Sequence, residues 1–223
     1  MASVYPTLVW LHLLLFVLWL GGDLGVFVLG QHFRRRDYSL AERLTLLKLL
    51  VAVDMGPRSA WALMVPMSLT LLYAGGWWPG LPVIAVLAGW AIGLFWLWLV
   101  WDAHAHDMTP RAARDRRIEA WLRYGLAAFY LGLGGLSVAT ATPLAPAWLA
   151  WKALCFGLIF AAAIMIDHEF KPVGAQLGAL IAQGSSDATE RPLRATMDGT
   201  RRWVLVVYVL LFVTSYLGSV KPF

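Results

Sequence analysis

The chain has 223 residues, of which 60% are hydrophobic and 14% are charged, and its mean hydropathy is +0.67. In a typical soluble domain about a quarter of all residues are charged, so this composition excludes a soluble domain and indicates an integral membrane protein. The net charge is +5, and the basic residues lie beside apolar stretches, where Lys and Arg set the orientation of a membrane protein. We therefore expect no nucleic-acid partner. The single cysteine, Cys155, excludes an intrachain disulfide.

Six apolar stretches are long enough to cross a bilayer, since a membrane-spanning helix needs about 20 residues. In chain order they are residues 6–32, 49–73, 81–104, 120–141, 147–168 and 203–217. We expect the first to be a retained span, because no basic segment precedes it. The sequence therefore predicts one all-α domain over residues 1–223, an integral membrane bundle of six transmembrane helices.

The segments between these stretches differ in character. Residues 77–82 and 142–147 are short, uncharged and rich in Pro and Gly, which is typical of tight turns. The other three connections are polar and basic. In the last of them, residues 170–199, we expect an interfacial helix over 171–184 and then a polar loop over 185–199, both on the cytoplasmic side.

The basic side chains predict the orientation of the bundle. Fifteen of the 18 Lys and Arg residues belong to the three basic connections and their borders: Arg34, Arg35, Arg36, Arg43, Lys48, Arg111, Arg114, Arg116, Arg117, Arg123, Lys171, Arg191, Arg194, Arg201 and Arg202. Cytoplasmic loops are enriched in Lys and Arg, so both termini are expected on the outer side of the membrane.

Ionisable side chains inside the spans are candidates for function, because each costs several kcal/mol in hydrocarbon unless it has a partner. Asp54 and Arg58 are four residues apart on one expected helix, which is the spacing of an intrahelical ion pair. Alternatively, Arg58 holds an anionic group such as a haem propionate and Asp54 tempers its charge. Asp23 on the first span is another possible partner of Arg58.

Four other side chains share one depth near the outer boundary. At 1.5 Å per residue, His12, Lys152 and Met67 lie roughly 8–9 Å inside it, with Met64 one turn deeper. An imidazole paired with a thioether, a second imidazole or an amine can supply the axial ligands of a membrane haem. The alternative is a hydrogen-bonded histidine among space-filling methionines.

The inner ends of the odd-numbered spans carry the remaining histidines: His32, His104, His106 and His168. Acidic residues lie among them, against the helix dipole, so they need cationic partners that the basic loops could supply. The functional alternatives are a divalent metal site, a second haem or a quinone site.

Several short motifs occur in a fixed order: Leu11-His12 followed by Trp19 and Gly21 or Gly22, His32 at the end of that span, Met64 to Met67 followed by Leu69 to Leu72, the run WLAWKAL over 148–154, and the ending VKPF over 220–223. Together they resemble the HemJ-type membrane protoporphyrinogen IX oxidases and the related CopD-like haem-binding membrane domains. The resemblance implies that His12 is a haem ligand and that Lys152 belongs to the haem or porphyrin pocket. The chain departs from the family in its extra spans around 81–141, in Asp54 and Arg58, and in having Ala150 near Lys152.

The leading interpretation is a b-type haem redox protein of the bacterial inner membrane that passes electrons to quinone or a respiratory partner. In its specific form, protoporphyrinogen oxidation, Lys152 and Arg58 hold carboxylates and Asp54 accepts a proton. Two alternatives stay open: copper transport of the CopD-like type through Met64, Met67 and Met165, and a non-catalytic subunit of a membrane complex. We expect a homo-oligomer or a complex subunit.

Overall fold

The computed structural model describes residues 4–223, and all of their regular structure is helical. The helices are α1 (Val4–Phe33), α2 (Leu40–Ala74), α3 (Val83–Ala105), α4 (Pro110–Thr140), α5 (Ala147–Phe170), α6 (Val173–Gln183) and α7 (Asp187–Val220). Five helical stretches are long and apolar enough to cross a membrane: those of α1, α3, α4, α5 with α6, and α7. The helix α2 is equally long, but its apolar part is interrupted by Asp54 and Arg58.

The expectation of a polar loop over residues 185–199 was wrong, because α7 runs through this segment as a continuous helix. Ser186 caps its first turn, accepting a hydrogen bond from the backbone N–H of Thr189, and the two residues form a capping box. Leu193, one turn further, is fully buried in a small core with Phe33 and Leu180. The polar composition of the segment therefore belongs to an amphipathic helix.

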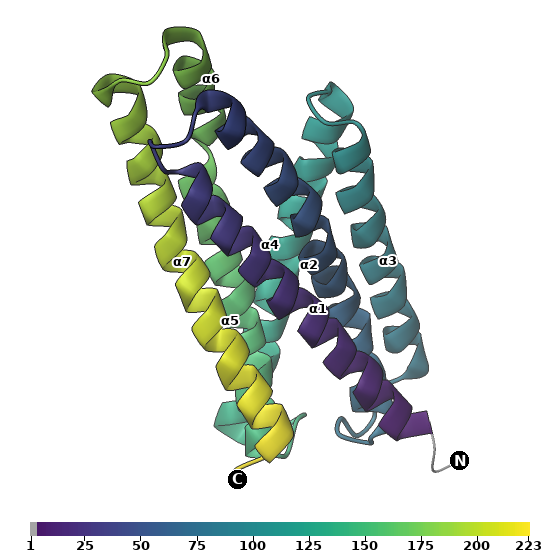
Figure 1. Ribbon diagram of the computed structural model, residues 1–223. Helices are drawn as coiled ribbons and strands as arrows, with labels where there is room; N and C mark the ends of the chain where they lie inside the picture. Colours follow the sequence, from purple (N-terminus) through teal and green to yellow (C-terminus); the bar gives the residue numbers. More distant parts are fainter. Residues whose placement is uncertain (1–3) are drawn as a thin grey trace.

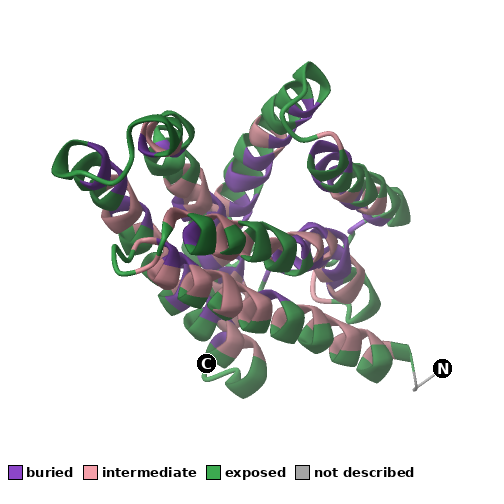
Figure 2. Cartoon of the chain, turned by 45° about the horizontal axis from the view of Figure 1, so that its top comes forward, coloured by how far each residue is buried: buried purple, intermediate pink, exposed green. Residues whose placement is uncertain are grey.

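From α1 to α5 each helix lies beside the next one in the chain, whereas α7 packs against α5 and against the short helix α6. Both termini lie at the same end of the bundle, and α6 lies at the opposite end, which we call the loop end (Figure 1). Buried residues occupy the helix faces that turn toward one another, and the outward faces are exposed (Figure 2). Close packing depends on small residues: a Cβ at Gly157 of α5 would lie 2.6 Å from the backbone nitrogen of Leu131 on α4.

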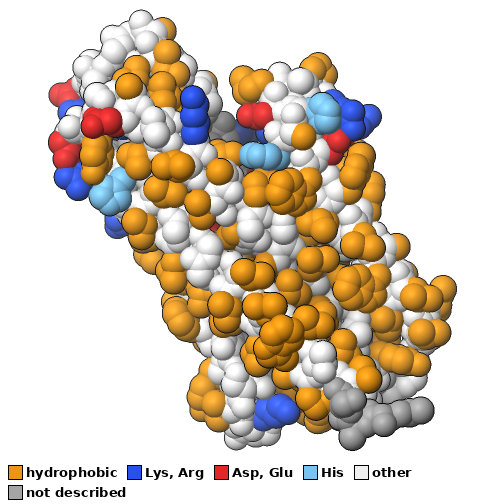
Figure 3. All heavy atoms as spheres, turned by 45° about the vertical axis from the view of Figure 1, so that its right-hand side comes forward, with side chains coloured by type: hydrophobic (Ala, Val, Ile, Leu, Met, Phe, Trp, Pro, Cys, Tyr) orange, Lys and Arg blue, Asp and Glu red, His pale blue; other side chains and the backbone are white. Residues whose placement is uncertain are grey.

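Charge is distributed unevenly along the bundle. On the face drawn in Figure 3, acidic, basic and histidine side chains gather mainly at the loop end, and hydrophobic side chains cover the middle. Many large hydrophobic side chains of the long helices are exposed, including Val17, Leu18, Val209 and Phe212, as expected for a surface in contact with lipid.

Candidate functional site

A cavity of about 490 Å³ lies in the half of the bundle that holds the termini. This volume falls in the range of about 300–1,000 Å³ that is usual for ligand pockets. Its wall is formed by residues of α1, α2, α4, α5 and α7 together with the short turns at that end. The aromatic lining residues are Tyr5, Phe16, Trp19, Trp77, Tyr130, Trp148 and Phe156.

His12 of α1 lines this cavity and has an unsatisfied nitrogen. Its Nδ1 is buried and has no hydrogen-bond partner among the described residues. A buried polar atom without a partner costs about 1–3 kcal/mol, so such atoms in native proteins usually have a function or a missing ligand. Because Nδ1 is enclosed by protein, a group bound in the cavity would reach the other ring nitrogen, Nε2, which makes no hydrogen bond with the described residues.

Two lysines also line the cavity, and none of its described lining residues is acidic. Lys152 of α5 makes no hydrogen bond or ion pair with the described residues, and its ammonium lies against the backbone of Gly218 on α7, where a Cβ would clash with Nζ. The Nζ of Lys221 lies 5.5 Å from the ring centre of Trp77 and 5.2 Å from that of Trp148. The cavity thus combines an apolar, aromatic wall with two positive charges, which favours an anionic amphiphile.

A layer of aromatic rings closes the cavity toward the loop end. Trp19 stacks on Trp61 with 5.5 Å between ring centres, and Trp61 contacts Trp96 at 5.0 Å. Tyr130 and Phe160 stack at 6.0 Å in the same layer. This packed layer separates the cavity from the charged side chains deeper in the bundle.

On the far side of the layer lies a chain of ion pairs, which we call the ion-pair chain: Arg58, Glu119, Arg123 and Asp167. Arg58 Nη2 of α2 donates to both carboxylate oxygens of Glu119 on α4, at 3.0 and 2.9 Å, and Trp96 Nε1 of α3 donates to Glu119 Oε1 at 3.1 Å. Arg123, one turn after Glu119, pairs with Asp167 of α5 at 2.5 Å. The carboxylate of Glu119 is 3% exposed and therefore depends on these donors.

The prediction that Arg58 pairs with Asp54 or with Asp23 was wrong. Arg58 pairs with Glu119 and forms no ion pair with either aspartate. The reason is geometric, because Glu119 approaches from a neighbouring helix and accepts a bidentate contact. Neither Asp54 nor Arg58 lines the cavity. Asp23 is linked to α7 instead, where Tyr208 Oη donates to its backbone carbonyl at 2.9 Å.

Of the four side chains expected to share an outer layer, three line the cavity: His12, Met64 and Lys152. The fourth, Met67, is 6% exposed but is not part of the cavity wall. Pro66 and Met67 lie in the same buried stretch of α2, so the helix turns this methionine toward the packed core.

The four inner histidines lie apart, each with its own neighbour. His32 Nδ1 is 3.0 Å from Tyr38 Oη, and His168 Nε2 is 3.0 Å from Tyr124 Oη. His106 Nδ1 contacts the backbone carbonyl of Asp102 at 3.0 Å, and the ring of His104 lies edge-on to Trp101. Residues 4–223 contain no group of three or more His, Cys, Asp or Glu side chains that could hold a metal ion.

Asp102, Asp107 and Asp167, three of the acids beside the inner histidines, have cationic partners. Asp102 pairs with Arg111, and Asp107 pairs with Arg116. The hydrogen bond from Arg116 holds the pKa of the Asp107 carboxyl below its ordinary value. These contacts are those of a solvated ionic network around the connecting loops.

Sequence reasoning missed Lys221, Gly218, Tyr130 and Glu119. Glu119 lies one residue before the expected span 120–141, and Lys221 lies after the last one, so neither was counted as an intramembrane group. The ending VKPF was the only signal for Lys221.

Comparison of the chain with protein-family models, curated proteins and solved structures gave no match.

Proposed function

We propose that this protein binds b-type haem in the cavity, with His12 as a ligand of the iron. The observation that carries the proposal is that His12 lines an aromatic cavity and that its imidazole makes no hydrogen bond with the described residues. Haem iron takes a neutral imidazole as its commonest protein ligand, and the thioether of Met64, which also lines the cavity, could serve as a second ligand. The haem would supply one-electron chemistry.

The charges of the cavity support the same assignment. Haem is flat and apolar with two carboxylates, and protoporphyrinogen IX carries the same two carboxylates on a puckered, apolar ring. Lys152 and Lys221 could hold those carboxylates while the aromatic wall packs against the ring. A protoporphyrinogen IX oxidase-like activity, with electrons passing to quinone or a respiratory partner, is the specific form that we propose. In this form Lys152 is the charged substrate-binding residue, and Arg58 and Asp54, which do not line the cavity, have no role in it.

We further propose that α2 is the sixth transmembrane helix, with both termini on the outer side of a bacterial inner membrane. The ion pair of Arg58 with Glu119 supports this placement, because it neutralises the charge of α2 within the bundle. The Lys and Arg side chains of the loop end would then face the cytoplasm.

The proposal is tested by a reduced-minus-oxidised absorption spectrum of the protein purified in detergent after expression with ample haem. We expect the paired bands of a low-spin b-type cytochrome. A purified, folded protein with no haem absorption would overturn the proposal. Copper in place of haem in a metal analysis of the same sample would favour transport.

A further inference from the structure

Aromatic residues cover both ends of the cavity, which limits the routes by which a ligand can enter it. The end toward the termini is covered by an aromatic lid: Trp77 Nε1 donates to Tyr5 Oη at 2.8 Å, and Trp77 packs edge-on against Trp148 at 5.6 Å. Lys221 lies over both indole rings. The opposite end is closed by the aromatic layer around Trp61. Both ends along the bundle axis are therefore covered.

The polar contacts between α1 and α7 are distributed unevenly along the two helices. In the half toward the loop end, polar contacts join the two helices and the turn after α1: Arg34 pairs with Asp198 at 2.6 Å, Arg36 with Asp187 at 2.8 Å, and Tyr208 donates to Asp23. Between this Asp23 contact and the end of the bundle that holds the termini, no hydrogen bond or ion pair joins residues 10–22 of α1 to residues 209–220 of α7 within the described part of the chain. The two helices are therefore joined at the loop end only and diverge toward the termini (Figure 1). We call this side of the bundle, between α1 and α7, the seam.

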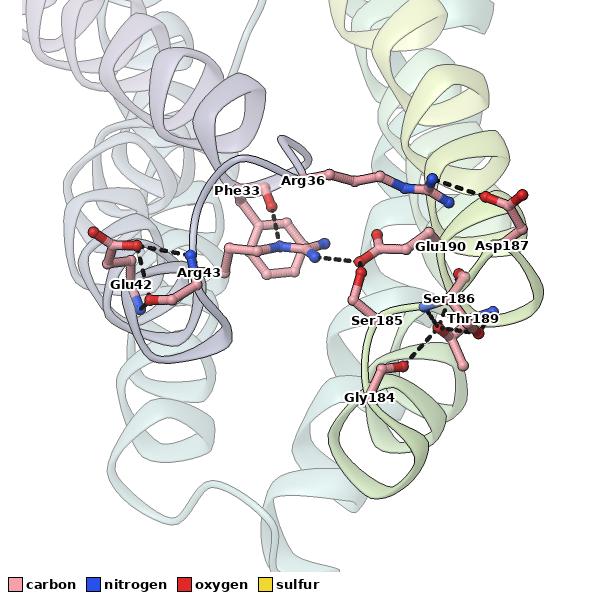
Figure 4. Close-up of polar contacts among 11 residues, drawn as sticks. Phe33, Arg36, Glu42, Arg43, Gly184, Ser185, Ser186, Asp187, Thr189 and Glu190 are labelled. Atoms are coloured by element: carbon pink, nitrogen blue, oxygen red, sulfur yellow. Dashed lines mark hydrogen bonds and ion pairs between the residues drawn. The ribbon is translucent and has the colours of Figure 1, made fainter.

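A buried contact reinforces the fastened end (Figure 4). Arg43 at the start of α2 donates to the backbone carbonyl of Phe33, the last residue of α1, at 2.8 Å and to Glu190 of α7 at 2.7 Å. Both charged side chains are almost fully buried, at 3% and 4% exposure. Breaking such a pair is strongly unfavourable, so the loop end of the seam is expected to stay closed.

The cavity reaches the outer surface in the unfastened half. Leu13 of α1 lines the cavity and is 45% exposed, and Ser219 of α7 lines it and is also exposed. The α7 side of the wall consists of small residues: Thr214, Ser215, Gly218 and Ser219. Apolar side chains such as Val17 and Phe212 are exposed nearby, so the surface that surrounds this opening faces lipid.

We propose that the outer half of the seam between α1 and α7 is a lateral portal, through which the cavity takes an amphiphile dissolved in the outer leaflet. The ligand class follows from the route and the lining together: an apolar, flat body that partitions into lipid and an anionic group that the lysines attract. The proposal rests on the proposed function for the identity of the ligand, but the route itself is a property of the seam.

Cross-linking tests the portal. In a Cys155→Ala background, Leu13→Cys with Ser215→Cys is joined in nanodiscs by the shortest of a graded series of bismaleimides that links the two positions, as verified by mass, and haem uptake by the haem-free protein is timed. We expect uptake to slow by about tenfold or more, as for a closed gate, whereas cross-linking after loading leaves the haem spectrum unchanged. The matched control, Arg34→Cys with Asp198→Cys, joins positions already held by an ion pair and should not slow uptake. Equal rates with and without the outer cross-link would overturn the proposal, as would equal slowing by both cross-links.

A second measurement separates failure of the portal from failure of haem binding. A spin label on Ser215→Cys, again without Cys155, is exposed to oxygen dissolved in the bilayer and to a water-soluble nickel chelate. We expect strong relaxation by oxygen and little by the chelate. The reverse pattern would mean that the cavity opens to water and would overturn the portal, whether or not the protein binds haem.

Discussion

The bundle contains two buried polar regions, and they differ in how their charges are compensated. In the ion-pair chain, Glu119 accepts hydrogen bonds from Arg58 and Trp96, so its charge is matched inside the protein. In the cavity, His12 Nδ1 has no partner and Lys152 makes no ion pair with the described residues. A matched buried network stabilises the fold, whereas an unmatched site is a cost that a ligand can offset. Substitutions in the two regions should therefore have opposite consequences.

The largest effect on stability is expected from Glu119→Gln. The change leaves Arg58 and Arg123 without their shared carboxylate, and breaking a buried pair typically costs about 3–5 kcal/mol. Because Arg58 is partly exposed, we expect the lower end of that range. The measurement is thermal unfolding in detergent, and Asp54→Asn is the control. If Asp54→Asn lowered Tm more than Glu119→Gln, the structure would have the wrong partner for Arg58.

Lys152→Met is expected to act in the opposite direction. It removes a buried, unpaired charge and keeps most of the side-chain volume, so the haem-free protein should gain up to about 1 kcal/mol of stability. Affinity for a dicarboxylate porphyrin should fall by about tenfold, as one charge-assisted hydrogen bond is lost. The two readouts are Tm and a porphyrin titration. A Tm that falls on substitution would show that Lys152 has a partner within the protein.

Gly218→Ala should change the cavity with little effect on the fold. The new Cβ occupies the space of the Lys152 ammonium, which lies at the end of a flexible side chain and can move. We expect a loss of stability below about 1 kcal/mol together with weaker porphyrin binding. Gly125→Ala on α4, where a Cβ meets no atom within 4 Å, is the matched control and should leave binding unchanged. Equal binding by both variants would argue against contact between Lys152 and the ligand.

The smallest effect is expected from Asp107→Asn at the loop end. Arg116 lowers the pKa of the Asp107 carboxyl, so this pair stabilises the fold above the ordinary pKa of 3.8 and its contribution is lost as the pH falls below that value. Both side chains are about half exposed, and such surface pairs contribute about 0–1 kcal/mol. Tm of the wild type and variant should differ slightly at pH 7 and converge in acid. A large difference at pH 7 would show that the loop end is less solvated than the structure indicates.

The contrast between the two regions also explains what the sequence could predict. Hydropathy located the apolar part of every long helix, and depth along the helices brought His12, Met64 and Lys152 to one cavity. Spacing could not reveal that Arg58 turns to Glu119, because a cross-helix contact depends on how α2 and α4 rotate about their axes. The helix over 187–199 was missed for a similar reason: its polar composition hid Leu193 and Glu190, whose burial depends on Phe33 and Arg43.

The central claim is that His12 ligates haem iron in the cavity, and His12→Gly with added imidazole tests it most directly. The substitution opens a space where the ligand was, and imidazole in solution can take its place at the iron. We predict that His12→Gly purifies with little haem or with a high-spin spectrum, that imidazole restores the low-spin spectrum, and that His32→Gly behaves as the wild type. A low-spin spectrum unchanged in His12→Gly, without imidazole, would contradict the account.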